Sequence, residues 1–91
     1  MDEAAQATEP NLLISLQTGV EKVLLIGDPR QLPSTCLSTD ANNTFFNRSL
    51  FERLIDAGTH PYFLNIQYRM APLIRHFPSH HFYSDRLIDA E

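Results

Sequence analysis

The 91-residue sequence contains no tryptophan. It has only one cysteine, Cys36, and therefore cannot form an internal disulfide. Small secreted scaffolds usually depend on several disulfides, and the sequence does not fit that class. No apolar run approaches the roughly 20 residues that a membrane span needs. The chain also does not open with a signal peptide. We therefore expect an intracellular protein of the nucleus or cytoplasm that does not contact membranes.

Positive charge is also scarce. Seven Lys and Arg residues stand against eleven Asp and Glu residues, and the formal net charge is -4. Surfaces that grip phosphate backbones are usually basic, so charge alone argues against a nucleic-acid-binding domain. If the whole protein binds nucleic acid, most of its basic surface is expected outside this segment.

The first half of the chain predicts a helix followed by a strand. Thr8 is a candidate N-cap, Glu9 and Pro10 suit a first helical turn, and Gly19 suits the helix end. The apolar run 23–26 ends in Gly-Asp-Pro, a pattern typical of a strand buried on both faces of a parallel sheet. The expected apolar face of the helix consists of Leu12, Leu13, Ile14 and Leu16.

The middle of the chain predicts a long surface loop and a second helix. Residues 33–48 are rich in Ser, Thr and Asn, which favours a loop. The segment Ser49–Ile55 has apolar positions at helical spacing, and Gly58 is a natural end.

The last third predicts a second strand and a third helix. Tyr62–Ile66 has the composition of a strand, and a helical pattern that begins at Pro72 is expected to be interrupted near Pro78. Helices and strands that alternate in this order indicate an α/β protein.

An acidic pair, Asp2-Glu3, follows Met1 without a preceding apolar run that could form a buried strand. Two interpretations remain open from the residues alone. The pair is either a solvated terminus, which composition favours, or the end of a strand that is missing from this chain.

Three segments, taken together, resemble superfamily 1B helicases of the nonsense-mediated-decay and senataxin type. These are Asp-Glu-Ala-Ala-Gln-Ala-Thr-Glu-Pro within residues 1–10, Leu-Ile-Gly-Asp-Pro-Arg-Gln-Leu-Pro at 25–33, and Gln-Tyr-Arg-Met-Ala-Pro at the start of 67–83. The resemblance implies an incomplete RecA-like P-loop NTPase fold, a parallel sheet with flanking helices. Residues 1–66 would then end the first RecA-like domain, and residues 67–91 would begin the second.

The resemblance also assigns roles toward ATP and Mg²⁺. Asp2 would hold Mg²⁺ through water, which suits an ion that prefers one or two carboxylates, waters and phosphates. Glu3 would act as the base that deprotonates the attacking water. Gln31 would contact the γ-phosphate and couple the state of ATP to domain motion. Asp28 and Arg30 would help to fix the loop around Gln31 or link it to the nucleic-acid side.

The third motif supplies Arg69, which would neutralise charge on the transferring phosphoryl group when the two domains close. Gln67 and Tyr68 would shape the nucleotide cleft beside it and belong to the nucleotide-binding set. The sequence departs from the family pattern at Ala71, where His is usual, and at Ser34, where a second Pro is common. The change at Ser34 is expected to loosen the loop that carries Gln31.

The phosphate-binding pattern G-x-x-x-x-G-K-S/T is absent from the chain. The isolated polypeptide is therefore expected to be inactive as an ATPase, and the bare acidic pair is expected to mark a cut through the first domain. The leading hypothesis is a fragment of a monomeric, ATP-dependent helicase that moves 5′-to-3′ on single-stranded RNA or DNA. The alternatives are a truncated, catalytically inactive binding module and a P-loop ATPase that does not unwind.

Overall fold

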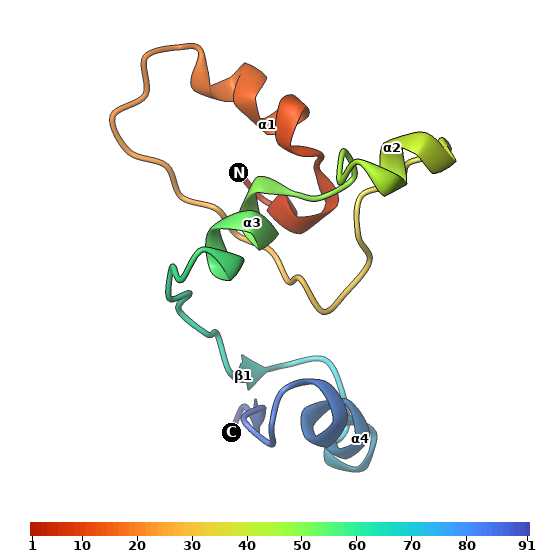
Figure 1. Cartoon of the computed structure of the whole chain (residues 1–91). Coiled ribbons are helices and arrows are strands. Elements are labelled where there is room, and N and C mark those ends of the chain that lie inside the picture. The colour runs from red at the N-terminus through yellow and green to blue at the C-terminus, as the bar shows by residue number, and fades with distance from the viewer. The chain divides into compact units, whose positions relative to one another are not determined.

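The computed structural model describes residues 1–91 and divides the chain into two compact units, Met1–His60 and Pro61–Glu91. Helices and a parallel pair of short strands confirm the expected α/β class. None of the helices has the length and apolar character needed to cross a membrane. The first unit contains η1 (Ala4–Gln6), α1 (Glu9–Leu16), α2 (Thr39–Asn43) and α3 (Leu50–Asp56), and the second contains β1 (Ile66–Gln67), α4 (Pro72–Phe82) and β2 (Ile88–Asp89) (Figure 1).

Helix α1 begins where the sequence predicts, with Thr8 extended before it and Pro10 in its first turn, but the Thr8 side chain forms no capping hydrogen bond and the helix ends at Leu16, before Gly19. Its predicted apolar face is only partly correct. Leu12 is 1% exposed and Leu16 packs beside it, whereas the side chains of Leu13 and Ile14 are exposed. Residues four apart lie on the same side of a helix, so the single buried stripe includes positions 12 and 16 and leaves 13 and 14 outside.

Helix α3 has the ends that its sequence predicts. The Ser49 hydroxyl accepts a hydrogen bond from the Glu52 amide at 3.1 Å and caps the helix N-terminus. At the other end, Gly58 has φ +96°, and its N–H donates to Ile55 while the Thr59 N–H donates to Leu54. These two bonds define a Schellman motif, which requires a left-handed residue at the glycine position.

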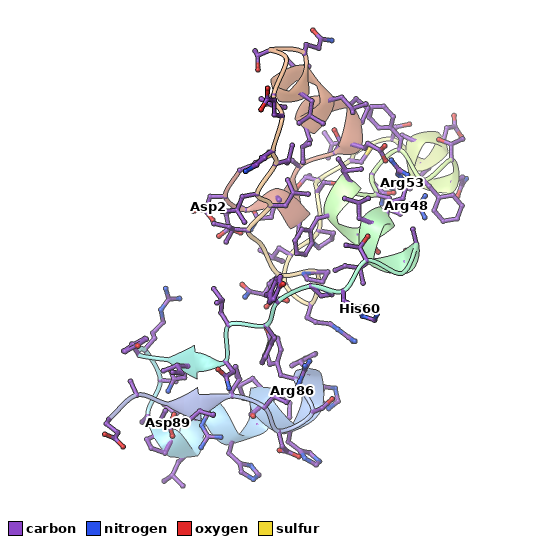
Figure 2. The ribbon with its side chains drawn as sticks, turned by 90° about the vertical axis from the view of Figure 1, so that its left-hand side faces the viewer. Asp2, Arg48, Arg53, His60, Arg86 and Asp89 are labelled. Carbon is purple, nitrogen blue, oxygen red and sulfur yellow. The ribbon has the colours of Figure 1, made fainter.

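The core of the first unit is small. Ala4 of η1, Leu12 of α1 and Leu50 of α3 are buried together, with Leu25 among the partly buried residues around them. The side chains of α1 and α3 also meet through an ion pair, in which Arg53 Nε and Nη2 donate to the two carboxylate oxygens of Glu9 at 2.8 and 2.6 Å. Figure 2 shows Arg53 on the ribbon of α3. This pair adds an electrostatic link between two helices that share few apolar contacts.

The Glu9–Arg53 pair predicts a dependence of stability on pH. The hydrogen bond from Arg53 lowers the pKa of the Glu9 carboxyl. A carboxyl with a lowered folded-state pKa stabilises the fold above its unfolded pKa, about 4.3, and loses that effect as pH falls through the folded value. We expect Glu9→Gln to destabilise the protein at about pH 7 and to destabilise it less at about pH 3. Urea unfolding at both pH values tests this, and an equal loss at both would contradict it.

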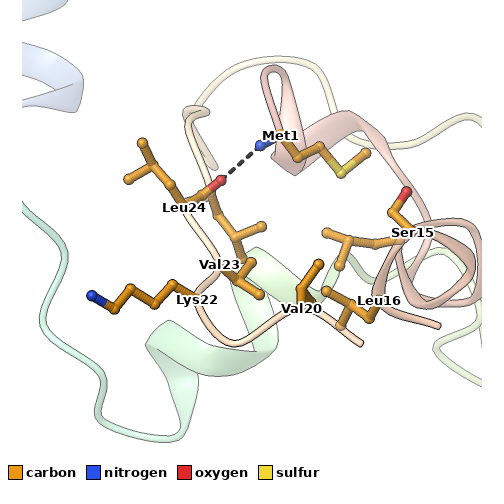
Figure 3. A pocket seen from close by; sticks show the side chains of 9 residues that line it. Met1, Ser15, Leu16, Val20, Lys22, Val23 and Leu24 are labelled. Atoms are coloured by element: carbon orange, nitrogen blue, oxygen red, sulfur yellow. Dashed lines mark hydrogen bonds between the residues drawn. The ribbon is translucent and has the colours of Figure 1, made fainter. Parts of the chain in front are cut away.

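The segment 23–27 is extended, but the prediction that it is buried on both faces is wrong. The Met1 amino group donates to the Leu24 carbonyl at 2.7 Å (Figure 3). The Ile26 N–H donates to the Met1 carbonyl at 2.9 Å. This is the hydrogen-bond pattern of a parallel pair. Val23 and Leu24 nevertheless remain 52% and 71% exposed. Burial of both faces requires covering layers on each side, and here only Leu25 faces packed residues.

The predicted loop 33–48 contains one short helix, α2, which the composition did not indicate. The Ser38 hydroxyl caps it by accepting from the Ala41 amide at 3.3 Å. The expectation that Ser34 loosens the neighbouring loop is not supported, because its side chain is buried and its hydroxyl donates to the Asn47 carbonyl. A hydroxyl supplies here a cross-link that a proline could not supply.

The second unit is a small β–α–β arrangement in which β1 and β2 are parallel neighbours. The predicted strand Tyr62–Ile66 is mostly irregular, and regular pairing begins only at Ile66. Helix α4 continues through Pro78, so the predicted interruption is also wrong. The Ser79 carbonyl accepts from the amides of Tyr83 and Asp85, and its hydroxyl accepts from Leu87 N–H at 3.2 Å. Pro78 has no backbone N–H to donate within the helix. The bonds to Ser79 hold the helix end in spite of this missing donor.

Candidate functional site

The acidic pair lies at a sharp bend just before η1. Glu3 has φ 50° and ψ 38°, a left-handed conformation that a residue with a side chain rarely adopts. The Glu3 amide donates to Asp2 Oδ1 at 2.9 Å, and Gln6 Nε2 donates to Glu3 Oε2 at 3.1 Å. Both acidic residues are exposed. Strain of this kind tends to occur at functional sites, and here it places two accessible carboxylates at a backbone turn.

The turn that carries Gln31 is organised by Asp28. The Asp28 carboxylate accepts from the Arg30 backbone N–H and from Gln31 Nε2, both at 2.9 Å. The Gln31 N–H also donates to the Asp28 carbonyl at 3.2 Å. The structure therefore supports the expectation that Asp28 fixes this loop. Gln31 itself is exposed, and its side-chain amide is held by the Asp28 carboxylate.

Gly27 joins the turn to the acidic segment. Ala4 N–H donates to the Ile26 carbonyl at 2.8 Å. A Cβ placed on Gly27 would lie 2.9 Å from the backbone nitrogen of Ala5 and 3.1 Å from that of Ala4. Neither backbone atom can move without shifting η1 and the bend at Glu3. Close approach of two backbones is therefore the reason for a glycine at this position.

We expect Gly27→Ala to displace η1 from the segment 23–27. Steric conflict in a packed contact costs about 1–3 kcal/mol, which corresponds to about 5- to 150-fold faster exchange of the amides in residues 1–6. Hydrogen exchange followed by mass spectrometry measures this in the full-length protein. Gly19→Asn is the matched control, because Gly19 has open space around it and asparagine tolerates its left-handed φ of +72°. Unchanged exchange in Gly27→Ala would contradict the contact.

In the second unit, the side-chain amide of Gln67 is fully used inside the protein. Its Oε1 accepts from the backbone N–H groups of Arg69 at 2.9 Å and Met70 at 2.7 Å. Its Nε2 donates to the Met70 carbonyl at 2.7 Å and to Asp89 Oδ1 at 2.6 Å. A primary amide has two donor hydrogens and an oxygen with two lone pairs, so these four bonds exhaust its capacity.

Asp89 on β2, which is labelled in Figure 2, accepts hydrogen bonds from both Gln67 and Arg75 of α4. Arg75 Nε and Nη2 donate to the two Asp89 carboxylate oxygens at 3.0 and 3.1 Å, and Arg75 Nη1 donates to the Leu87 carbonyl at 3.2 Å. The hydrogen bonds from Arg75 and then Gln67 lower the pKa of the Asp89 carboxyl. Sequence reasoning missed Asp89 and Arg75. The feature that identifies them is the parallel pairing of Gln67 with Asp89, and this pairing is visible only in the folded structure.

Tyr68 and Arg69 differ from Gln67 because their side chains are exposed, Tyr68 at 84%. The Arg69 guanidinium makes no hydrogen bond or ion pair within the structure, whereas Arg53 and Arg75 are paired with carboxylates. An arginine without an internal partner is available to bind an external anion. The predicted site residues thus fall into two sets, with Asp2, Glu3 and Gln31 in the first unit and Gln67, Tyr68 and Arg69 in the second.

Comparison with known proteins places both sets in matched regions. A family described as an AAA domain matches residues 1–39, and a second family with the same description matches residues 46–91. The chain is 52% identical over 89 residues to Probable helicase MAGATAMA 3 of Arabidopsis thaliana, covering 98% of this chain and 11% of that protein. It is 47% identical to Helicase SEN1 of Saccharomyces cerevisiae over 98% of this chain and 4% of that protein. It is 44% identical to the yeast ATP-dependent helicase NAM7 over 96% of this chain and 9% of that protein.

These matches define the class as AAA-type P-loop nucleoside triphosphatases. Within that class, the chain belongs to the superfamily 1B helicases of the nonsense-mediated-decay and senataxin type. The chain spans between 4% and 11% of the length of the three relatives named above. The roles of individual residues remain predictions from the motifs.

Proposed function

We propose that this chain is a segment of an ATP-dependent helicase and contributes two groups of residues to its ATP-hydrolysing site. Residues 1–66 belong to the first RecA-like domain in this proposal, and residues 67–91 begin the second. The observation that carries the proposal is the contact at Gly27, which ties the acidic pair to the turn of Gln31 within one unit. Family membership supports the same reading because the relatives are named as helicases.

In the proposed reaction, water attacks the γ-phosphorus of ATP and the bond to the ADP oxygen breaks. Glu3 accepts the proton that the water loses, as a general base positioned by the bend at η1. Gln31 contacts the γ-phosphate from the turn that Asp28 holds. Arg69 stabilises negative charge on the transferring phosphoryl group, a task suited to an exposed and permanently charged guanidinium.

Asp2 fits the Mg²⁺ that accompanies ATP in this class. Its carboxylate is exposed, and only one of its oxygens is engaged, by the Glu3 amide. That arrangement suits Mg²⁺, which keeps several waters and takes few protein ligands when phosphates are bound. When bound, the ion would neutralise phosphate charge, with Asp2 as its ligand through water.

Tyr68 lies exposed beside Arg69 and contributes to the nucleotide-binding surface, and Gln67 shapes that surface through the turn it holds. We further propose that the whole protein acts as a monomer on single-stranded RNA or DNA, in the nucleus or cytoplasm. The net charge of -4 supports a location of most nucleic-acid contacts outside this segment.

Strand displacement by the full-length protein tests this function and separates it from its alternatives. We expect ATP-dependent unwinding of duplexes that carry a 5′ single-stranded overhang, and little unwinding of the same duplexes with a 3′ overhang. ATP hydrolysis without unwinding of either substrate would favour a P-loop ATPase that acts as a switch. Binding of nucleic acid without ATP hydrolysis would favour an inactive binding module.

A further inference from the structure

The turn that carries Arg69 has no regular secondary structure, yet its backbone is held firmly. It lies between β1 and α4, and the Arg69 N–H donates to Gln67 Oε1 at 2.9 Å. The next residue, Met70, is bound through both its N–H and its carbonyl to the same amide group. One side chain therefore determines where the Cα of Arg69 lies.

That side chain is itself fixed from the neighbouring strand. Gln67 and Asp89 are register partners in the parallel pair, and the Ala90 N–H donates to the Gln67 carbonyl at 3.0 Å. Partners across a pair of strands have their side chains close together, and Gln67 Nε2 reaches Asp89 Oδ1 at 2.6 Å. Arg75 holds Asp89 in a bidentate pair, so Asp89 cannot turn away without breaking it.

We infer that Gln67 is a positioning residue for Arg69, anchored by Asp89 and Arg75, and that it acts on ATP only through the turn it holds. The chemistry supports this division. All four bonding positions of the Gln67 amide are occupied within the protein, whereas the Arg69 guanidinium has no internal partner. A contact from Gln67 to a nucleotide would require breaking bonds that define the position of Arg69. This inference rests on the proposed role of Arg69 in phosphoryl transfer.

A double-mutant cycle in the full-length protein tests the inference. The four proteins are the wild type, Gln67→Ala, Arg69→Ala and the double variant, each assayed for kcat and for KM toward ATP with single-stranded nucleic acid present. Gln67→Ala is expected to lower kcat by about 10²-fold, the size of effect that a misplacement of about 1 Å produces. KM for ATP is expected to change by less than about 3-fold, because no contact to the nucleotide is lost. In the Arg69→Ala background, Gln67→Ala is expected to have almost no further effect on kcat.

Each other outcome overturns the inference in a distinguishable way. A rise in KM with unchanged kcat would show that Gln67 contacts the nucleotide directly. An equal fall in kcat with and without Arg69 would show a general structural role. If Arg69→Ala leaves kcat unchanged, both this inference and the proposed function of Arg69 fail. If Arg69→Ala lowers kcat and Gln67→Ala does not, only the inference fails.

Two further variants guard against misfolding. Gln67→Glu keeps an oxygen for the amides of Arg69 and Met70 but loses both donors and faces the Asp89 carboxylate, so kcat is expected to lie between those of the wild type and Gln67→Ala. Gln17→Ala is the matched control, because Gln17 is an exposed glutamine whose side chain makes no hydrogen bond in the structure. Gln17→Ala is expected to keep wild-type kcat and KM, and a Gln67→Glu variant as impaired as Gln67→Ala would contradict the role of the two accepted bonds.

Discussion

Replacing Glu3 with Gln in the full-length protein is expected to lower the kcat of nucleic-acid-stimulated ATP hydrolysis by about 10²–10⁴-fold, the usual contribution of a general base. An amide cannot accept the proton of the attacking water. It retains an oxygen that can accept from Gln6 Nε2, so the local bonding at the bend is expected to survive. Asp2, the proposed ligand of Mg²⁺, is unchanged. ATP affinity is therefore expected to remain within about 3-fold of the wild type.

Two assays check the prediction: steady-state ATP hydrolysis, and equilibrium binding of ATP by calorimetry. Glu21→Gln removes the same charge at an exposed acidic residue that lies outside the motifs, and it should leave both values unchanged. A Glu3→Gln protein with near-normal hydrolysis would eliminate Glu3 as the base. Loss of ATP binding in step with hydrolysis would instead indicate that Glu3 holds the bend together.

Arg69→Ala is expected to have the largest effect of any single change in the second unit. Arginines that stabilise a transferring phosphoryl group contribute about 10³–10⁵-fold to kcat in related hydrolases. The structure gives a reason to expect a clean result. The Arg69 guanidinium bonds to nothing in the chain, so its removal should not disturb the turn that Gln67 holds through the Arg69 backbone. The fold is expected to be preserved while the rate falls.

Arg69→Lys sharpens this prediction. A lysine supplies the charge as a single point and cannot present the planar fork of a guanidinium, so we expect only partial recovery of kcat. Arg48→Ala is a control that removes the same charge outside the motifs. The Arg48 side chain pairs with Asp56 at 3.8 Å and lies over the ring of Phe45. Full activity in Arg69→Ala would contradict a role for Arg69 in the transfer step.

Local signals predicted where α1 begins and both ends of α3. The caps of α3 depend on residues within one turn of the helix end, Ser49 before it and Gly58 after it. Such interactions depend little on the rest of the fold, so they can be read from the chain. The predicted break in α4 is wrong. Hydrogen bonds between Ser79 and the following segment compensate for the backbone N–H that Pro78 lacks.

The strands and the second half of the site could not be predicted in the same way. Whether 23–26 is buried depends on covering layers that sequence pattern does not reveal, and most of these residues are exposed. Gln67 and Asp89 are far apart in the chain, and only the register of β1 and β2 brings them together. The motif residues Asp2, Glu3, Gln31 and Arg69 were identifiable through their family pattern. The residues that hold them in place became visible only with the fold.

The most direct test of the central claim is ATP hydrolysis by the full-length protein, measured without nucleic acid, with single-stranded RNA and with single-stranded DNA. We predict that at least one of the two nucleic acids strongly stimulates hydrolysis, and that Glu3→Gln and Arg69→Ala each abolish the stimulated rate. Absence of hydrolysis under all three conditions, or stimulated hydrolysis that survives both substitutions, would contradict the assignment of this segment to the ATP-hydrolysing site of a helicase.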